Sequence, residues 1–427
     1  MEIVGSNPIG VAIQNNMEKK QFAETIIIGA GLSGLAAGKN LLSKNKNFLI
    51  VEQNDKIGGK VNTEQFQGFQ LDYGFQVILD GYKNTKKYID IDKLQLQFFD
   101  SGALIWDGKL LQTISDPTRD IKSLANTIMS PIGTIKDKIK IFFLKIKLSL
   151  TNENKIFRMD NKETKTFFKE HGFSEEFITR FLKPFFSGIL LDEDLKTPHT
   201  YMLYLFKLFS KSKAGVPLNG MQEIPNLLAT QIPKENLLLG SKVKKIENDK
   251  IILENNKVIY CKNIICAIEK NNVESLIQTN NFKTRKYFSC TTHYYSINNL
   301  KSVFGNKHKT KKIILNGSGK GRINNIAIMS NIAKSYAPKN SNLIAVTTLG
   351  KKTESEEIVY ELQTWLSFNK KNIEHLKSMH IEEALPIYKP NITDNNNGNV
   401  IFCGDYLFHP SIEGAINSGI NAGEQIN

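Results

Sequence analysis

The sequence predicts an α/β fold in which one domain is built from segments near both ends of the chain and a second domain is inserted between them. Residues 25–42 form a short β-branched run, a glycine-rich turn and a helical stretch, and residues 398–424 form another strand, turn and helix. Between them, residues 81–214 have helical periodicity and are rich in Lys, Phe, Leu and Ile. Strands that alternate with helices in this way indicate a parallel sheet covered by helices.

The composition is that of an ordinary globular protein. The chain has 427 residues, which is enough for two or three domains, and it is 41% hydrophobic and 23% charged. No run of 18 apolar residues occurs, so no transmembrane helix is expected. Residues 1–21 contain neither the apolar stretch of a secretory signal nor an Arg-rich presequence, and we expect them to form a flexible extension.

The net charge of +14 does not by itself indicate a nucleic-acid partner. Only five of the 56 basic residues are arginines, and the lysines are accompanied by abundant Asn and Ile, which is the usual product of AT-rich coding sequence. A surface that reads phosphates more often recruits arginine. We therefore expect no nucleic-acid partner.

The four cysteines lack the spacing of a metal site. They are Cys261, Cys266, Cys290 and Cys403, with no Cys-x-x-Cys pair, and the seven histidines form no H-E-x-x-H pattern. We expect reduced, mostly buried thiols in a cytoplasmic protein and no metal ion.

The first motif is a G-x-G-x-x-G turn directly after the strand at residues 25–28. Its six residues are Gly29, Ala30, Gly31, Leu32, Ser33 and Gly34. The first glycine allows a tight turn, the second lets the backbone approach a pyrophosphate, and the third lets helix and strand pack closely. The amides at the start of the helix would then face the diphosphate.

A second strand at residues 48–51 ends in Glu52, followed by Gln53. An acid at this distance from the glycines accepts hydrogen bonds from ribose hydroxyls and repels a 2′-phosphate. These features predict a dinucleotide site and fit NAD and FAD equally well.

The next segment separates the two cofactors. Glu52, Gly58, Gly59, Lys60 and Thr63 form the pattern E-x5-G-G-[RK]-x-x-[ST], which resembles the signature of the flavin-containing amine oxidase superfamily. That superfamily also includes the phytoene desaturase-like enzymes and protoporphyrinogen oxidase. The resemblance implies FAD, with the paired glycines beside the extended cofactor and the basic residue in contact with it. Lys60 stands where Arg is commoner, so the charge is kept and the bidentate fork is lost.

The resemblance implies further cofactor contacts along the chain. Residues 68–76 resemble the D-x-G segment that brings backbone to the isoalloxazine ring, here at Gly74 and Phe75. In the predicted β-meander that follows residue 240, Val243 would contact the adenine through its backbone. Ala267, at the end of the strand from residue 263, would lie beside the diphosphate.

The C-terminal segment resembles the part of the family that holds the flavin. A strand ends in Gly404 and Asp405, and a helix then opens near Pro410. One wide face of that helix carries almost no side-chain bulk, through Gly414, Ala415, Ser418, Gly419, Ala422 and Gly423. Glycine in a helix costs about 1 kcal/mol relative to alanine, so close packing is expected there. The resemblance implies that Asp405 bonds the ribityl–diphosphate region and that the helix start, at the amides of Ala415 and Ile416, faces the flavin N1 and C2 carbonyl.

The middle of the chain is expected to form the substrate domain. One helix is predicted over residues 167–182 and another over 201–209, with strands at 291–296 and 342–348. Residues 181–189 resemble a substrate-lining stretch of the desaturase-like enzymes, and a core helix ended by Pro184 is an equally good interpretation. His293 is a candidate proton-transfer group, although a hydrogen-bonded histidine in a sheet is the more common case.

Residues 136–150 combine lysines with apolar side chains. Such a segment can lie in a membrane interface, so peripheral membrane contact is one interpretation. An amphipathic helix packed on the protein's own core is the default.

Together these features predict a discontinuous three-layer Rossmann-like FAD-binding domain from residues 22–80, 215–270 and 386–427. An inserted α+β substrate domain would comprise residues 81–214 and 271–385. FAD would be bound non-covalently, since no cysteine stands where some family members attach it, and the flavin itself would carry the chemistry.

The expected activity is removal of hydride from an apolar, isoprenoid- or carotenoid-like substrate. Amine-oxidising members place an aromatic ring just before Glu-Gly-Ala, where this chain has Pro410-Ser411-Ile412. A flavin amine oxidase remains one alternative, and a non-catalytic FAD-binding protein is another. No oligomeric state is predicted.

Overall fold

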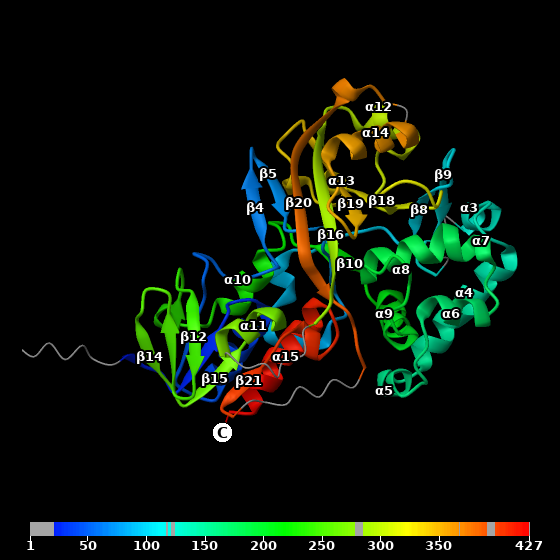
Figure 1. Cartoon of the computed structure of the whole chain (residues 1–427). Helices are drawn as coiled ribbons and strands as arrows, with labels where there is room; N and C mark the ends of the chain where they lie inside the picture. Colours follow the sequence, from blue (N-terminus) through cyan, green and yellow to red (C-terminus); the bar gives the residue numbers. More distant parts are fainter. Residues whose placement is uncertain are drawn as a thin grey trace, which may run out of the picture.

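A computed structural model describes residues 21–116, 118–120, 124–277, 285–366, 368–390 and 398–426. The extension expected over residues 1–21 lies outside this part of the chain, apart from Gln21. Figure 1 shows two bodies of structure joined by long strands. The predicted fold class is confirmed: a discontinuous α/β domain carries an inserted α+β region.

The first body is centred on a five-stranded sheet. Its order is β11-β3-β2-β15-β21, and each neighbouring pair is parallel. The strands are Leu237–Leu238, Phe48–Val51, Thr25–Ile28, Asn263–Cys266 and Val400–Phe402. Three separate stretches of sequence therefore meet in one sheet, as Figure 1 shows for β15 and β21.

Alternation along these strands produces three layers, because successive side chains point to opposite faces of a sheet. Ile27, Ile50 and Ile265 point into the core shared with helix α1, Leu32–Ser43, and helix α15, Ile412–Glu424. The alternate side chains of the same strands point into a second core, which they share with a smaller sheet. That sheet has the order β1-β14-β13-β12, with strands Gln21–Phe22, Val258–Tyr260, Lys250–Leu253 and Val243–Glu247. Its β12, β13 and β14 are antiparallel, and β1 joins β14 in parallel. The predicted β-meander is confirmed.

The small side chains of α15 allow it to lie directly on α1. A Cβ added to Gly419 would lie 2.0 Å from the carbonyl oxygen of Ser33, and one added to Gly423 would lie 2.6 Å from Asn40 Oδ1. The close packing expected from the sequence is therefore present. Two further helices flank this domain, α10, Glu223–Ala229, which contacts α1, and α11, Lys270–Ile277, which contacts β12.

The second body contains a seven-stranded sheet of order β20-β16-β19-β18-β17-β8-β9. Its strands are Ile373–Pro386, Tyr287–Ile297, Asn342–Leu349, Ile323–Ile328, Ile313–Asn316, Ala103–Trp106 and Leu111–Ile114. Helices α12, Leu300–Phe304, and α14, Ser355–Leu366, pack on one face of this sheet. The other face is turned toward helix α8, Lys183–Leu190.

Smaller elements complete the framework. Two minor sheets consist of β4 with β5, and of β6-β10-β7. Their strands are Thr63–Phe66, Phe69–Asp72, Ile78–Leu79, Ala214–Val216 and Gln97–Phe98. The remaining α-helices are α2 Lys83–Tyr88, α3 Leu124–Met129, α4 Ile135–Leu150, α5 Glu153–Phe157, α6 Thr164–Glu170, α7 Glu175–Phe177, α9 His199–Lys211 and α13 Met329–Ile332. Short 3-10 turns occupy Ile91–Leu94, Lys234–Asn236, Gly305–Lys307, Lys334–Tyr336, Lys370–Asn372 and Asp405–Leu407.

The single helix predicted over residues 167–182 is wrong. Helix α6 stops at a turn where Gly172 has φ +69°, and α7 is followed by one π-helical turn, Ile178–Leu182. Pro184 does not end a helix either, because it sits in the first turn of α8, where a missing N–H costs nothing. A π-helical turn is unusual in a core helix and is often found at functional sites.

Within the described residues, no helix has both the length and the apolarity needed to cross a bilayer. All four cysteines are buried and free.

Candidate cofactor site and adjoining cavity

A single large cavity of about 2210 Å³ begins at the carboxyl ends of the parallel strands. Ligands of open α/β sheets bind at this edge. Most of the residues predicted to bind the cofactor line it: Gly29, Gly31, Leu32, Ser33, Glu52, Gln53, Gly58, Gly59, Lys60, Gly74, Phe75, Val243, Ala267, Gly404, Asp405 and Ala415. Four do not, namely Ala30, Gly34, Gly414 and Ile416.

The glycine turn forms the floor of the cavity at the end of β2. Gly29 has φ +101°, a conformation that favours glycine, and its amide donates to the Val51 carbonyl at 2.8 Å. Gly31 borders open space, since an added Cβ would meet no atom within 4 Å. Gly34 lies behind the turn, where a Cβ would be 1.9 Å from the Gly29 carbonyl oxygen. The absence of a side chain at Gly31 therefore leaves room for a ligand. At Gly34 it allows helix α1 to pack against the backbone of Gly29.

The first amides of α1 are available to an anion. Gly31 is the N-cap of the helix and supplies no side-chain acceptor, and Leu32 and Ser33 both border the cavity. Unpaired amides at a helix start, together with the helix dipole, favour a phosphate group.

Glu52 lies buried at the end of β3 with both carboxylate oxygens engaged. One oxygen accepts from the Ala30 amide at 2.8 Å, and the other accepts from the amide and side chain of Asn54 at 2.9 and 2.8 Å. A carboxylate has about four lone-pair sites, so capacity remains for ribose hydroxyls. Ala30 thus acts by orienting Glu52 and does not border the cavity.

The paired glycines run alongside the first glycine turn. The Gly58 amide donates to the Ala30 carbonyl at 2.8 Å, and Gly31 and Gly58 form a parallel bridge. Gly58 and Gly59 have φ of +119° and +58°, so side chains would be strained at both positions. The two segments build one backbone-walled channel.

Lys60 is held in an acidic cluster at the cavity wall. Its Nζ lies 2.7 Å from Glu269 Oε1 and donates to the Glu383 carbonyl at 3.1 Å. Burial alone would lower the pKa of Lys60, but Asp405 and Glu269 outweigh it and raise the pKa. Burial also raises the pKa of Asp405, against the opposing effect of Lys60. The ammonium therefore stays charged beside Asp405, the residue expected to approach the cofactor.

Glu269 was missed from the sequence. It stands two residues beyond Ala267, at the end of β15, and it borders the cavity. An acid just past the carboxyl end of a central parallel strand was the available signal.

The amides expected to face the flavin, those of Ala415 and Ile416, are not the free amides at the start of α15. The Ala415 amide donates to the Ser411 carbonyl at 2.9 Å, and the Gly414 amide donates to the Ser411 hydroxyl at 3.0 Å. Ile416 is fully buried. Among the described residues, no acceptor is found for the amides of Ile412 and Glu413. Of these two residues, Ile412 borders the cavity and Glu413 does not, so the Ile412 amide is the group at the helix start that can meet a ligand.

Glu413 fixes the position of this helix start. Its buried carboxylate accepts from the Asn84 amide at 2.9 Å and from the Thr85 amide and hydroxyl at 2.9 and 2.7 Å. It thereby caps α2 and ties α2 to α15. The Glu-Gly-Ala string is recognisable in the sequence as a family feature, but the sequence does not indicate this structural role of Glu413.

The remaining predicted contacts occupy the cavity walls in different ways. The Phe75 amide donates to Thr292 Oγ1 at 3.1 Å, so its backbone is already anchored to β16. The Ala267 amide likewise donates to the Ile28 carbonyl at 2.8 Å, within the parallel sheet. The Gly404 amide donates to Ser418 Oγ at 2.9 Å, which ties this turn to α15. The next residue, Asp405, borders the cavity. Val243, at the start of β12, also borders the cavity.

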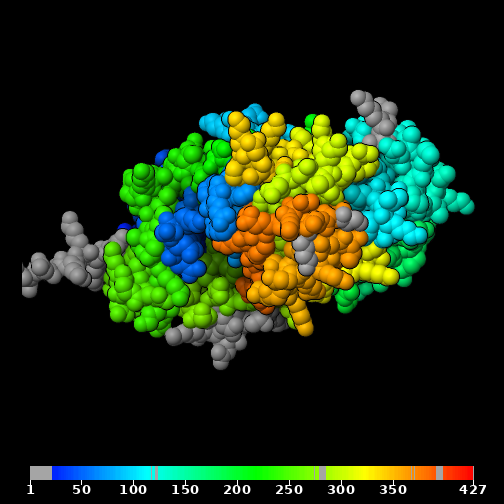
Figure 2. Space-filling view, turned by 90° about the horizontal axis from the view of Figure 1, so that it is seen from above, coloured from blue at the N-terminus to red at the C-terminus, as the bar shows by residue number. Residues whose placement is uncertain are grey.

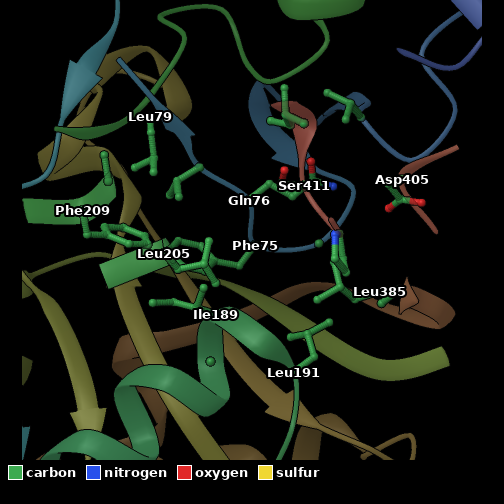
Figure 3. A pocket seen from close by; sticks show the side chains of 18 of the residues that line it. Phe75, Gln76, Leu79, Ile189, Leu191, Leu205, Phe209, Leu385, Asp405 and Ser411 are labelled. Atoms are coloured by element: carbon green, nitrogen blue, oxygen red, sulfur yellow. The ribbon is translucent and has the colours of Figure 1, made fainter. Parts of the chain in front are cut away.

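Beyond the residues predicted to bind the cofactor, the cavity continues as an apolar chamber inside the second body. In Figure 3, Asp405 and Ser411 lie at one end and Leu79, Leu205 and Phe209 at the other. The π-helical turn and α8 supply much of the wall between them, through Phe181, Leu182, Pro184, Phe185, Phe186 and Ile189. This stretch is therefore helical, contributes to the core and also lines the cavity.

His293 lies outside the site. It is fully buried in β16, does not border the cavity, and its ring nitrogens are hydrogen-bonded to Ser378 Oγ at 2.7 Å and Thr353 Oγ1 at 2.8 Å. Burial, with the nearby His375, lowers the pKa of His293 to about 4. It is a hydrogen-bonded sheet histidine and is no longer a candidate for proton transfer.

Comparisons with known proteins agree with this geometry. A stretch of 102 residues is 33% identical to 4,4′-diapolycopene oxygenase of Methylomonas sp, covering 21% of this chain and 20% of that protein. An oxidoreductase of Methanosarcina mazei superposes with a TM-score of 0.72 at 18% identity, over 94% of this chain and 100% of that chain. A putrescine oxidase bound to putrescine superposes with a TM-score of 0.69 at 14% identity, over 95% and 99%.

The two structural likenesses show the fold, and the matches to the first curated relatives span about a fifth of those proteins' length. The profile of a family described as flavin containing amine oxidoreductase matches residues 32–375, which is most of the chain. The chain belongs to the flavin containing amine oxidoreductase family.

Proposed function

We propose that this protein is an FAD-dependent oxidoreductase that removes hydride from an apolar, isoprenoid- or carotenoid-like substrate. The observation that carries the proposal is the single cavity that joins the glycine-walled channel to a chamber lined by phenylalanine and aliphatic side chains. The partial likeness to a diapolycopene oxygenase supports the same class of substrate.

The residues present fit an FAD molecule bound non-covalently. Glu52 and Val243 would hold the adenosine end of FAD. The diphosphate would lie along the backbone at Gly31 and Gly59, and Asp405 would hold the ribityl region. The fit rests on the channel itself, in which a Cβ at Gly31 would fill the open space and the first amides of α1 face the cavity. We propose residues 22–80, 215–270 and 386–427 as the FAD-binding domain, and residues 81–214 and 271–385 as the substrate domain.

When bound, FAD would supply the two-electron acceptor that removal of a hydride from the substrate requires. The chain's own groups contribute orientation and electrostatics. The Ile412 amide at the start of α15, which borders the cavity, would stabilise negative charge that develops next to it. Leu205, Phe209 and their neighbours exclude water from the chamber, and an apolar substrate needs no charged side chain to hold it.

The visible spectrum of the purified protein tests the proposal. We expect a yellow flavin band, release of FAD by denaturation and filtration, and anaerobic bleaching by a partly saturated isoprenoid hydrocarbon delivered in detergent micelles. Putrescine is the matched amine control and should leave the band unchanged. Bleaching by the amine alone would identify an amine oxidase, and a flavin that neither compound reduces would identify a binding protein. A protein that takes up no FAD would refute the proposal.

A further inference from the structure

The second body carries an exposed apolar surface on two helices, which we call the entrance face. Its members are Leu124, Ile128 and Met129 of α3 and Ile135, Ile139, Phe143, Ile146 and Leu150 of α4. Their side chains are between 38% and 84% exposed. Figures 1 and 2 place α3 and α4 at the end of the molecule opposite the β12–β14 sheet. Single exposed apolar residues are common in proteins, but a contiguous group of this kind marks an interaction site.

The face is a continuous stripe along α4. Ile135, Ile139, Phe143, Ile146 and Leu150 follow one another at spacings of three and four residues, which places them on one side of the helix. The opposite side is already occupied by the protein, because Asp137 and Leu148 are buried and α4 packs on α9. The helix therefore has one partner within the chain and one apolar side without a partner among the described residues.

The stripe is continuous with the chamber. Leu124, Ile128, Ile135 and Ile139 are at least 38% exposed and also line the cavity. The chamber that begins at the channel under α15 thus opens to the outside between α3 and α4. A molecule entering at this point would meet apolar side chains from the surface inward.

The charge on α4 indicates what covers the stripe. The helix carries five lysines, at 136, 138, 140, 145 and 147, against one acid, Asp137. That acid is buried in the capping box with Thr134. Lys145 is only 16% exposed and is ion-paired with Asp116, so the uncompensated charge of the helix comes from the lysines at 136, 138, 140 and 147. A second copy of this chain would bring the same cationic helix against itself. A bilayer that contains anionic lipid attracts each surface lysine and accepts an apolar stripe between the head groups.

We propose that the entrance face docks on the surface of an anionic phospholipid bilayer, so that an apolar molecule passes from the acyl chains into the chamber without crossing water. Docking stands on the stripe and its lysines alone, whereas the passage of substrate also rests on the proposed function. The contact is peripheral, with α4 lying along the interface.

Vesicle binding by the full-length protein tests docking. We expect co-sedimentation with vesicles of phosphatidylcholine and phosphatidylglycerol, weakened by high salt, and little binding to phosphatidylcholine alone. Phe143→Glu and Leu150→Glu change residues that are 62% and 84% exposed and do not line the cavity. Each should weaken binding by about tenfold or more, because a buried apolar side chain is replaced by a charge that anionic lipid repels.

Tyr360→Glu is the matched control. Tyr360 is 68% exposed on α14, away from the entrance face, so this variant should bind vesicles as the unaltered protein does. Failure of the unaltered protein to bind anionic vesicles would overturn the proposal. Binding by both α4 variants that is as strong as that of the unaltered protein would also overturn it. A dimer in light scattering that the α4 variants convert to monomers would also overturn it, since the face would then be an interface between copies. Flavin reduction in detergent is measured separately, so a wrong substrate class would leave the vesicle result standing.

Discussion

Gly31 and Gly34 lie three residues apart in one turn, and replacing each by alanine should have different consequences. At Gly31 the backbone has φ −73°, which alanine adopts freely, and the added Cβ would point into open cavity. At Gly34 the added Cβ would lie 1.9 Å from the backbone oxygen of Gly29. The first substitution should therefore act on the cofactor and the second on the fold.

The expected magnitudes follow from these contacts. In Gly31→Ala, the lower conformational entropy of the unfolded chain stabilises the folded protein by about 0.4–1 kcal/mol. Alanine is a weaker N-cap than glycine, which costs a similar amount. The free energy of unfolding of the flavin-free protein should therefore change by less than about 1 kcal/mol. Loss of one hydrogen bond to a charged phosphate costs about 1.5–3 kcal/mol, which is about 10- to 100-fold in FAD affinity. In Gly34→Ala, overpacking of the Cβ against backbone costs about 1–3 kcal/mol or more. The better helix propensity of alanine offsets about 1 kcal/mol of this cost.

Two measurements on flavin-free protein separate these effects. Thermal unfolding without cofactor should give equal melting temperatures for Gly31→Ala and the unaltered protein, and a lower one for Gly34→Ala. Titration with FAD, followed by quenching of flavin fluorescence, should then show weak binding by Gly31→Ala. The reasoning is refuted if Gly31→Ala binds FAD normally, or if its flavin-free form melts well below the unaltered protein.

Three further perturbations probe other parts of the molecule. Glu413→Ala leaves the Asn84 and Thr85 donors without their acceptor and should cost about 3–5 kcal/mol, seen as a lower melting temperature, and Glu413→Gln should cost less because it keeps one oxygen. The pKa of His293 is lowered to about 4 in the fold from 6.5, so the unfolded chain binds the proton first and stability is lost as pH falls from 6.5 to 4, by about 3 kcal/mol. His293→Gln should therefore flatten the fall of melting temperature over that pH window. Ile189→Asp places a charge in the apolar chamber and should reduce bleaching by an isoprenoid hydrocarbon by about tenfold or more, with the flavin spectrum unchanged.

Each of these has its own control. A melting temperature of Glu413→Ala equal to that of the unaltered protein would show that the link between α2 and α15 does not depend on the carboxylate. An unchanged pH slope in His293→Gln would show that another group titrates in that window. Ile189→Leu keeps the chamber apolar, so a loss of substrate response in this variant as large as in Ile189→Asp would argue against charge as the cause.

Much of the nucleotide domain could be predicted because its signals are local. A strand of β-branched residues followed by Gly29 and Gly31 predicts a tight turn that no larger side chain would allow, and β2 and α1 form where expected. Glu52 could be placed because it directly ends the next strand. Prediction was poorer in the helical region, where Gly172 and the π-helical turn break the periodicity that predicted one helix, and Pro184 begins a helix where it was expected to end one.

By itself, the sequence determined the dinucleotide turn, the acid at the end of the second strand and the small-residue face of the last helix. These depend on backbone conformation and side-chain size within a few residues. Only the tertiary structure decided that Ile412 is the first-turn residue of α15 that borders the cavity, that Lys60 is held by Glu269, and that the channel continues into an apolar chamber opening between α3 and α4. Such features depend on which distant segments pack together, and the pattern within a single segment does not contain that information.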